Sequence, residues 1–132
     1  MRREASEQSE MISQLLFGES FTILEHNKEW SKIESVYDRC QGFVDNKQIQ
    51  FISEDLFNNL QEQSSVLSGE NIDFITNDNN ALTTIPLGAV LPFYANERFS
   101  IANTTYHYDG KIYTGKLAKT EIIRTAFVYL NT

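Results

Sequence analysis

Apolar and polar residues alternate over short runs in the first third of the chain. Phe21 with Ile23, and Trp30 with Ile33, stand among polar neighbours, which is the pattern of short, half-buried β-strands. The polar run between the two pairs contains an asparagine suited to a tight connection. A helix over this stretch is disfavoured because Gly18 lies in its middle and β-branched and aromatic residues follow. The pattern therefore predicts two strands joined by a turn.

The middle of the chain begins with a helical pattern and then becomes polar. Ser53 precedes two acidic residues, and Leu56 and Leu60 follow four positions apart. This spacing predicts a short amphipathic helix with Ser53 as its N-cap. Residues 61–80 are mostly polar, and we expect them to form a connection that contains one strand, at Ile72–Ile75.

The second half returns to strand-like alternation. Aromatic residues alternate on both sides of Asp109-Gly110, a dipeptide suited to a two-residue hairpin turn in which both central residues need positive φ. Near the end, Thr120 precedes apolar residues at helical spacing, and their β-branched content leaves a strand open as an alternative. The residues of this predicted helical stripe are Ile123, Ala126, Phe127 and Leu130.

The two halves can be aligned with each other. The segment LFGESF (Leu16–Phe21) matches PLGAVL (Pro86–Leu91), and each places a glycine ahead of a predicted strand. Further along, CQGFV (Cys40–Val44) loosely matches IYTGKL (Ile112–Leu117) at a similar interval. Two units of this kind predict an all-β fold of tandem small β-barrels with short helices.

Composition limits the classes of function that remain. The chain has 132 residues and a formal net charge of -7, and it contains no basic run. The electrostatic contribution that dominates nucleic-acid affinity is therefore missing, and attraction to anionic lipid is equally disfavoured. No apolar run approaches the roughly 20 residues needed to span a bilayer, so we expect no membrane insertion. No basic start followed by an apolar stretch is present, so we expect no export signal in this chain.

Reactive side chains are few. Cys40 is the one cysteine, which excludes an intramolecular disulfide. It could act as a nucleophile with His26 or His107 as base, but neither histidine stands in a recognisable motif. A small apolar residue in a strand is the interpretation we favour for Cys40. Two histidines also fall short of the ligand set of a metal site. We therefore predict no catalytic residue, no metal and no cofactor in this chain.

The first third resembles a known family. Its motifs are an Arg-x-Glu-Ala-Ser opening at residues 2–6 and Ser-Glu-Met-x-x-Gln-Leu-Leu-Phe-Gly-Glu at residues 9–19. A Trp-x-Lys-Ile strand follows at residues 30–33, and then a Tyr-Asp segment that leads to Gly-Phe-Val at residues 37–44. Together these resemble the first bacterial SH3-like domain of NlpC-type cell-wall cysteine peptidases, which are γ-D-glutamyl-L-diamino-acid endopeptidases. The segment IPLGAVLPFY (Ile85–Tyr94) and the residues that follow it more weakly resemble the second SH3-like module of the same architecture.

The resemblance implies a function for the module. In the family, the first SH3-like domain covers the active-site cleft and contributes an acid and an aromatic residue that select a free N-terminal L-Ala. By this resemblance Glu4 and Tyr37 are the candidate substrate-binding residues. The chain departs from the family pattern where Arg39 replaces a glycine, Cys40 a tyrosine and Phe43 a tryptophan. If that tyrosine recognises the ligand in the family, its replacement by Cys40 affects ligand selection in this chain.

These observations combine into one expected organisation, an all-β chain with short helices and two tandem SH3-like small β-barrels. We expect a first SH3-like domain at 1–50, a connecting helix and linker at 51–80, and a second SH3-like domain at 81–118. Residues 119–132 are expected to form a helix that leads toward a papain-like catalytic domain, which this chain does not contain.

The expected function is a non-catalytic segment for substrate recognition and active-site gating in a bacterial peptidoglycan peptidase. Its partners would be a stem peptide with a free N-terminal L-Ala and the catalytic domain, with no nucleic acid. By resemblance the location is the bacterial cell envelope, with the cytoplasm as an alternative. Two other hypotheses remain open: a stand-alone SH3-like adaptor that binds wall peptides or a protein partner, and an independent enzyme that uses Cys40 and a histidine.

Overall fold

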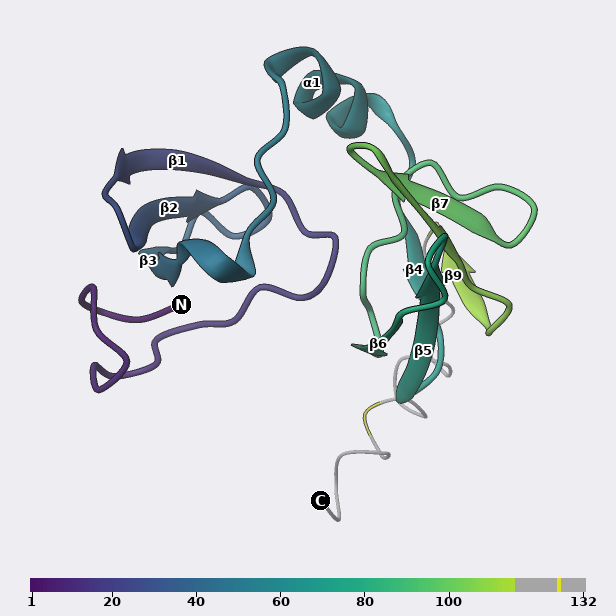
Figure 1. Cartoon of the computed structure of the whole chain (residues 1–132), viewed down its shortest axis with the longest axis horizontal. Helices are drawn as coiled ribbons and strands as arrows, with labels where there is room; N and C mark the ends of the chain where they lie inside the picture. The colour runs from purple at the N-terminus through teal and green to yellow at the C-terminus, as the bar shows by residue number, and fades with distance from the viewer. Residues whose placement is uncertain (116–125, 127–132) are drawn as a thin grey trace.

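The computed structural model describes residues 1–115 and residue 126, and it shows antiparallel sheets joined by a short helix (Figure 1). The first sheet has the order β1-β2-β3, formed by β1 (Phe21–His26), β2 (Trp30–Ser35) and β3 (Gln41–Asp45). The two strands predicted from the alternation are therefore confirmed, and so is the all-β class of the described residues. Ile33 of β2 is fully buried, as alternation within the strand requires.

A buried polar network closes one end of this sheet. Ser31 is fully buried, and its hydroxyl donates to Asn46 Oδ1 over 2.6 Å. The Asn46 amide in turn donates to the carbonyl of Asn27 over 2.8 Å. Because the single Ser31 proton is used in this way, His26 Nδ1 must be the donor in the 2.9 Å contact between the two side chains. The network fixes the short 3-10 helix η1 (Asn46–Gln48) against the hairpin and gives His26 a structural role.

The helix predicted in the middle of the chain is also confirmed. It is α1 (Glu54–Glu62), and the Ser53 hydroxyl accepts a hydrogen bond from the Leu56 N–H over 3.2 Å. Glu54 and Asp55 lie in the first turn, where carboxylates favour the positive end of the helix dipole. None of the helix residues is fully buried, so its apolar side chains are only partly covered by the rest of the described chain.

The second half contains more strands than the sequence indicated. The four-stranded sheet has the order β6-β5-β8-β7, and β4 pairs with β9 in a separate two-stranded sheet. The bounds are β4 (Val66–Ser68), β5 (Ile72–Asn77), β6 (Leu82–Pro86), β7 (Arg98–Ile101), β8 (Thr104–His107) and β9 (Ile112–Thr114).

Part of the segment expected to be a linker is strand. Both β4 and β5 lie inside residues 51–80, and they pair with β9 and β8 from much later in the chain. The polar local sequence does not reveal such long-range pairing, which is why one strand was expected where two are present. The division into domains at residues 50, 80 and 118 stays a prediction, as does the pair of SH3-like barrels.

The hairpin predicted at Asp109-Gly110 is wrong. Strand β8 ends before this dipeptide and β9 begins after it, but β8 pairs with β5 and β7 while β9 pairs with β4. Neither Asp109 nor Gly110 has positive φ. The chain makes a corner between two sheets here because the side chain of Tyr108 is fully buried and its hydroxyl donates to the Lys111 carbonyl over 2.9 Å. The hairpin of this region joins β7 to β8 instead, with Ala102 at φ 50°.

The core of the second half receives a side chain from the first. Phe17, which precedes β1, packs edge-on against Phe99 and Tyr106, with ring centroids 6.1 and 5.7 Å apart. Its carbonyl also accepts a hydrogen bond from the Val90 N–H over 2.9 Å. The stretch before β1 therefore joins the two halves. The buried residues of this core are Ile75, Ile85, Ala89, Leu91, Phe99 and Tyr108.

The aligned segments of the two halves lie against each other. Gly18 and Gly88 both have positive φ, at 80° and 84°, and both lie in turns. Strand β1 follows Gly18 as the alignment predicted, whereas Gly88 is followed only by an isolated bridge at Val90. A Cβ on Gly18 would collide with the backbone of Val90, so the two segments are in close contact there. Apart from Ala126, the helical stripe predicted for residues 119–132 lies outside the described residues. Across residues 1–115, α1 and η1 are both too short and too polar to cross a bilayer.

Candidate functional site

The residues before β1 add a further segment to the first sheet. Arg2 and Phe43 exchange two backbone hydrogen bonds, each 2.8 Å, in antiparallel sense. The pairing is an isolated bridge at Arg2, and the chain bends at residues 3–6, so Glu4 lies outside the ladder. The Glu4 side chain is exposed, and its N–H donates to the Ser9 hydroxyl over 2.9 Å, which holds the loop in place.

Tyr37 lies in the turn that joins β2 to β3, and its side chain is 90% exposed. Both candidate residues are therefore exposed, and their proximity to each other stays a prediction. The structure does not place either of them in the large cleft described below.

Two further carboxylates lie in and beside the Tyr37 turn. The pKa of Asp38 is lowered, chiefly because the Cys40 N–H donates to its carboxylate over 3.0 Å. The pKa of Glu34 is also lowered, first by a hydrogen bond from the Gln41 amide over 2.8 Å and then by Arg39 at 2.9 Å. Both groups are therefore ionised at neutral pH, but Arg39 offsets the charge of Glu34, so the net negative charge of this turn comes from Asp38.

Arg39 occupies the position at which the resembled family has a glycine. Its φ is 61°, in the left-handed region that glycine adopts without steric cost. The turn therefore holds a non-glycine residue in a conformation that glycine adopts more readily. The ion pair from Arg39 Nη1 to Glu34 Oε1 partly offsets the strain of this conformation.

Cys40 is not paired with a base in the described structure. Its sulfur lies 3.9 Å from the Gln41 carbonyl, in the loop that leads into β3 rather than inside a strand. His26 lies at the opposite end of the sheet, a strand length of roughly 17–20 Å away. His107 faces Glu97 in the second half, with 3.7 Å between Nε2 and Oε2. This geometry gives no support to the hypothesis of an enzyme that uses Cys40 and a histidine.

Metal ligands do not gather anywhere in residues 1–115. In that part of the chain, no group of three histidine, cysteine, aspartate or glutamate side chains is close enough to hold an ion.

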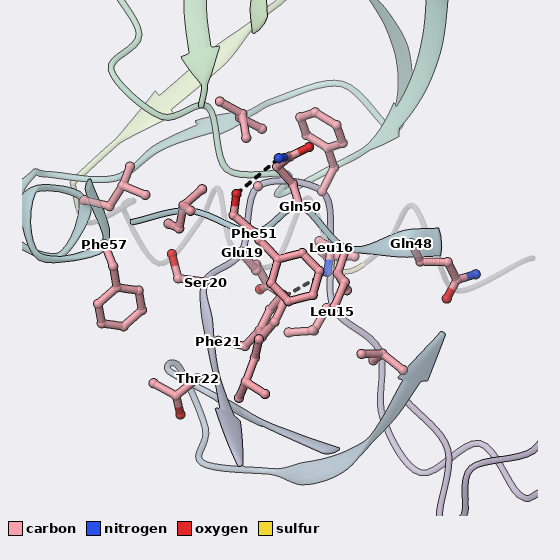
Figure 2. Close-up of a pocket in the computed structure, with 18 of the residues that line it drawn as sticks. Leu15, Leu16, Glu19, Ser20, Phe21, Thr22, Gln48, Gln50, Phe51 and Phe57 are labelled. Atoms are coloured by element: carbon pink, nitrogen blue, oxygen red, sulfur yellow. Dashed lines mark hydrogen bonds between the residues drawn. The ribbon is translucent and has the colours of Figure 1, made fainter. Parts of the chain in front are cut away.

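A large cleft lies between the first sheet, α1 and the β7–β8 hairpin. It has a volume of about 820 Å³ and is open to solvent on one side. Figure 2 shows Phe21 of β1, Phe51 of the connecting segment and Phe57 of α1 around it, with Leu15 and Leu16 on the chain before β1. Phe51 is 51% exposed, which is unusual for an aromatic residue in a concave site.

Sequence reasoning missed this cleft. Its walls come from several separate parts of the chain, and no local motif brings them together. The available signal was an excess of apolar residues that the predicted strands and helix left unassigned, such as Phe51 and Ile52 between the first strands and the helix.

The comparison with protein families bears on the first sheet. Residues 1–49 match a family model described as a bacterial dipeptidyl-peptidase SH3 domain. The match covers β1 to β3, the preceding segment and η1, and it therefore includes both Glu4 and Tyr37. No curated protein and no solved structure matches the chain. The first third of the chain is thus similar to a bacterial SH3-like domain of the kind associated with peptidases.

Proposed function

We propose that this chain is a non-catalytic segment for substrate recognition and active-site gating in a bacterial peptidase that cleaves free muropeptides. The observation that carries the proposal is the match of residues 1–49 to the peptidase-associated SH3 domain. The two candidate residues Glu4 and Tyr37 both lie within the matched range, and both are exposed. The catalytic domain is expected to be papain-like and to follow this segment in the parent protein, in the bacterial cell envelope.

The proposed ligand group is the free N-terminal amine of a peptidoglycan stem peptide that begins with L-Ala. The Glu4 carboxylate would accept a charge-assisted hydrogen bond from the ammonium, and the ring of Tyr37 would form an aromatic wall beside it. The ionised Asp38 adds a negative potential that favours the cation. A blocked amine lacks the charge, so intact wall strands with substituted termini would be rejected.

The test uses the full-length product of the gene that encodes this chain. Its kcat/KM is measured on a stem tripeptide with a free N-terminus and on the same peptide N-acetylated. Glu4→Gln removes the charge at nearly constant size, and we expect it to lower the preference for the free amine by about tenfold, in line with a charge-assisted hydrogen bond.

Glu25→Gln is the matched control, since Glu25 is an exposed carboxylate of β1 at the end of the sheet opposite the Tyr37 turn. The control variant should keep the full preference. A full-length product without peptidase activity, or a preference that Glu4→Gln leaves intact, would contradict the proposal.

A further inference from the structure

The free edge of the first sheet borders the cleft. The sheet order places β1 at the edge, and Phe21 and Ile23 of β1 both line the cleft. Val36 donates its N–H to the Ser20 carbonyl over 3.1 Å, which makes these two residues a bonded pair across β1 and β2. Bonded and non-bonded pairs alternate along an antiparallel ladder. The N–H and C=O groups of Phe21 and Ile23 therefore point away from β2, toward the open edge.

The opposite wall of the cleft is apolar and only partly covered. Leu56, Phe57 and Leu60 of α1 line it, and none of them is fully buried. Phe93 also lines it and is 36% exposed, whereas Phe51, which is 51% exposed, packs edge-on against His26 of β1 with ring centroids 5.4 Å apart. An exposed apolar surface in a concave site of a protein indicates a binding surface.

The charge around the cleft has one dominant sign. The carboxylates among its lining residues are Glu7, Glu19, Asp45 and Glu54, whereas Arg2 supplies the one basic side chain in the described lining. Arg2 is already engaged, with Nη1 donating to the Ser9 carbonyl over 2.9 Å and Nη2 3.8 Å from the Glu7 carboxylate. The Met1 ammonium, which also lines the cleft, donates to the Ser13 carbonyl over 2.9 Å, and the carboxylates still outnumber the two cations. The remaining charge is negative, as is the chain as a whole. Such a rim attracts a basic ligand and repels an acidic one.

We propose that this cleft binds an extended, basic peptide segment of a partner protein, which adds a strand to the free edge of β1. The main chain of the partner would bond to the outward-facing groups of Phe21 and Ile23, which is the strand-addition mode of peptide recognition. Its apolar side chains would pack on Phe51 and Phe57, and its basic side chains would meet the carboxylates of the rim. This interaction is separate from the amine site at Glu4 and Tyr37.

A bulge sets the length of the added strand. The register between β1 and β2 shifts between Ile23 and Glu25, so Leu24 is the extra residue. A bulge twists an edge away from pairing, and it therefore limits strand addition to the part of β1 that borders the cleft.

The probe is the fluorescein-labelled hexapeptide Lys-Ile-Lys-Phe-Lys-Ile, and its binding is followed by fluorescence anisotropy. The acidic analogue with glutamate at the three lysine positions is the charge control. We expect saturable binding of the basic peptide, weakened by added salt, and at least tenfold weaker binding of the acidic peptide. No saturable binding, or equal binding of the two peptides, would refute the proposal.

Main-chain recognition is tested on the peptide itself. Two versions of the peptide carry methyl groups on backbone amide nitrogens. One version is methylated at the three lysines and the other at the three apolar residues. Because alternate residues of an added strand bond to the edge, one version should lose at least tenfold in affinity and the other much less. Equal effects of the two methylation patterns would exclude strand addition.

Protein variants then locate the site. Ile23→Pro removes an edge-facing N–H without removing a β1–β2 hydrogen bond, and it should weaken the basic peptide about tenfold. Glu54→Gln should weaken it about two- to fivefold, and Glu62→Gln, at the far end of α1 and outside the cleft, should leave it unchanged. An equal loss of peptide affinity in the two glutamate variants would contradict the assignment of the cleft as the binding site. Dimerisation of this chain at the assay concentration that blocks peptide binding would contradict it as well.

Discussion

The carbonyl oxygen of Phe17 accepts a hydrogen bond from the N–H of Val90 over 2.9 Å. This bond joins the segment before β1 to the strand-forming region of the second half. The ring of Phe17 packs against Phe99 and Tyr106 in the core of the same half. The two halves are therefore coupled through a short stretch that also contains the turn at Gly18 and Glu19, where the Leu16 N–H donates to the Glu19 carboxylate over 2.8 Å.

The first prediction separates close contact from backbone strain at two glycines. Gly18 and Gly88 have nearly the same positive φ, but a Cβ on Gly18 would meet the Val90 carbonyl, whereas on Gly88 it would lie 3.6 Å from Leu16 Cδ1. We expect Gly88→Ala to lower the free energy of unfolding by about 1–2 kcal/mol through strain alone. Gly18→Ala should cost clearly more. Urea denaturation of the two variants gives the comparison, and equal losses would show that the two segments are not in close contact.

The second prediction concerns the coupling of the two halves through Phe17. Phe17→Ala removes an aromatic side chain that is half-buried against Phe99 and Tyr106. We expect the free energy of unfolding to fall by about 2–3 kcal/mol, below the full range for a fully buried phenylalanine. Thermal unfolding measured by near-ultraviolet circular dichroism reports on the aromatic core. An unchanged transition would contradict the packing of Phe17 on the second half.

The third prediction uses the burial of Tyr108. Burial raises the pKa of its hydroxyl above the ordinary tyrosine value, and burial raises the pKa of Tyr94 as well. The unfolded chain therefore ionises first as pH rises, so stability is complete below about pH 10 and is lost as pH rises toward the folded-state pKa.

Tyr108→Phe removes one of these two groups. The variant should be less stable at neutral pH by about 1 kcal/mol because the hydrogen bond to the Lys111 carbonyl is lost. Its free energy of unfolding should then decline less steeply above pH 10 than that of the wild type. Denaturant titrations over a pH series measure both slopes, and parallel curves would exclude a buried, protonated Tyr108.

The fourth prediction concerns the turn that carries Tyr37. Arg39 has φ 61°, which a glycine tolerates and a β-branched residue does not. Arg39→Gly relieves strain but loses the ion pair with Glu34, so we expect stability to change by less than about 1 kcal/mol. Arg39→Val loses the ion pair and adds strain, and it should be clearly less stable than Arg39→Gly. If thermal unfolding shows that Arg39→Val is more stable than Arg39→Gly, Arg39 does not adopt the left-handed conformation.

Local signals explain which parts of the fold could be predicted. The strands around Phe21 and Trp30 and the cap at Ser53 depend on residues close in sequence, and these predictions are confirmed. The hairpin at Asp109-Gly110 also had a strong local signal. It is wrong because the burial of Tyr108 and the pairing of β9 with β4 determine the path of the chain there.

The candidate sites also divide into a part that the sequence could indicate and a part that only the folded chain shows. Glu4 and Tyr37 were named by resemblance, and the structure shows that both are exposed, while their proximity and their role in binding stay predictions. The cleft beside β1 could not be foreseen. Its apolar wall comes from the connecting segment and α1, and its edge comes from β1, so only the packed chain shows it.

The most direct test of the recognition role is an amide chemical-shift titration of this chain with the stem tripeptide L-Ala-γ-D-Glu-diaminopimelate, run in parallel with its N-acetyl form. The account predicts that the free peptide shifts the amides of Glu4, Tyr37 and Asp38 and leaves Phe21 and Ile23 in the cleft unmoved. The acetylated peptide should give at most a tenth of that affinity. Equal shifts from the two peptides, or no shift at Glu4 and Tyr37 at millimolar peptide, would contradict it.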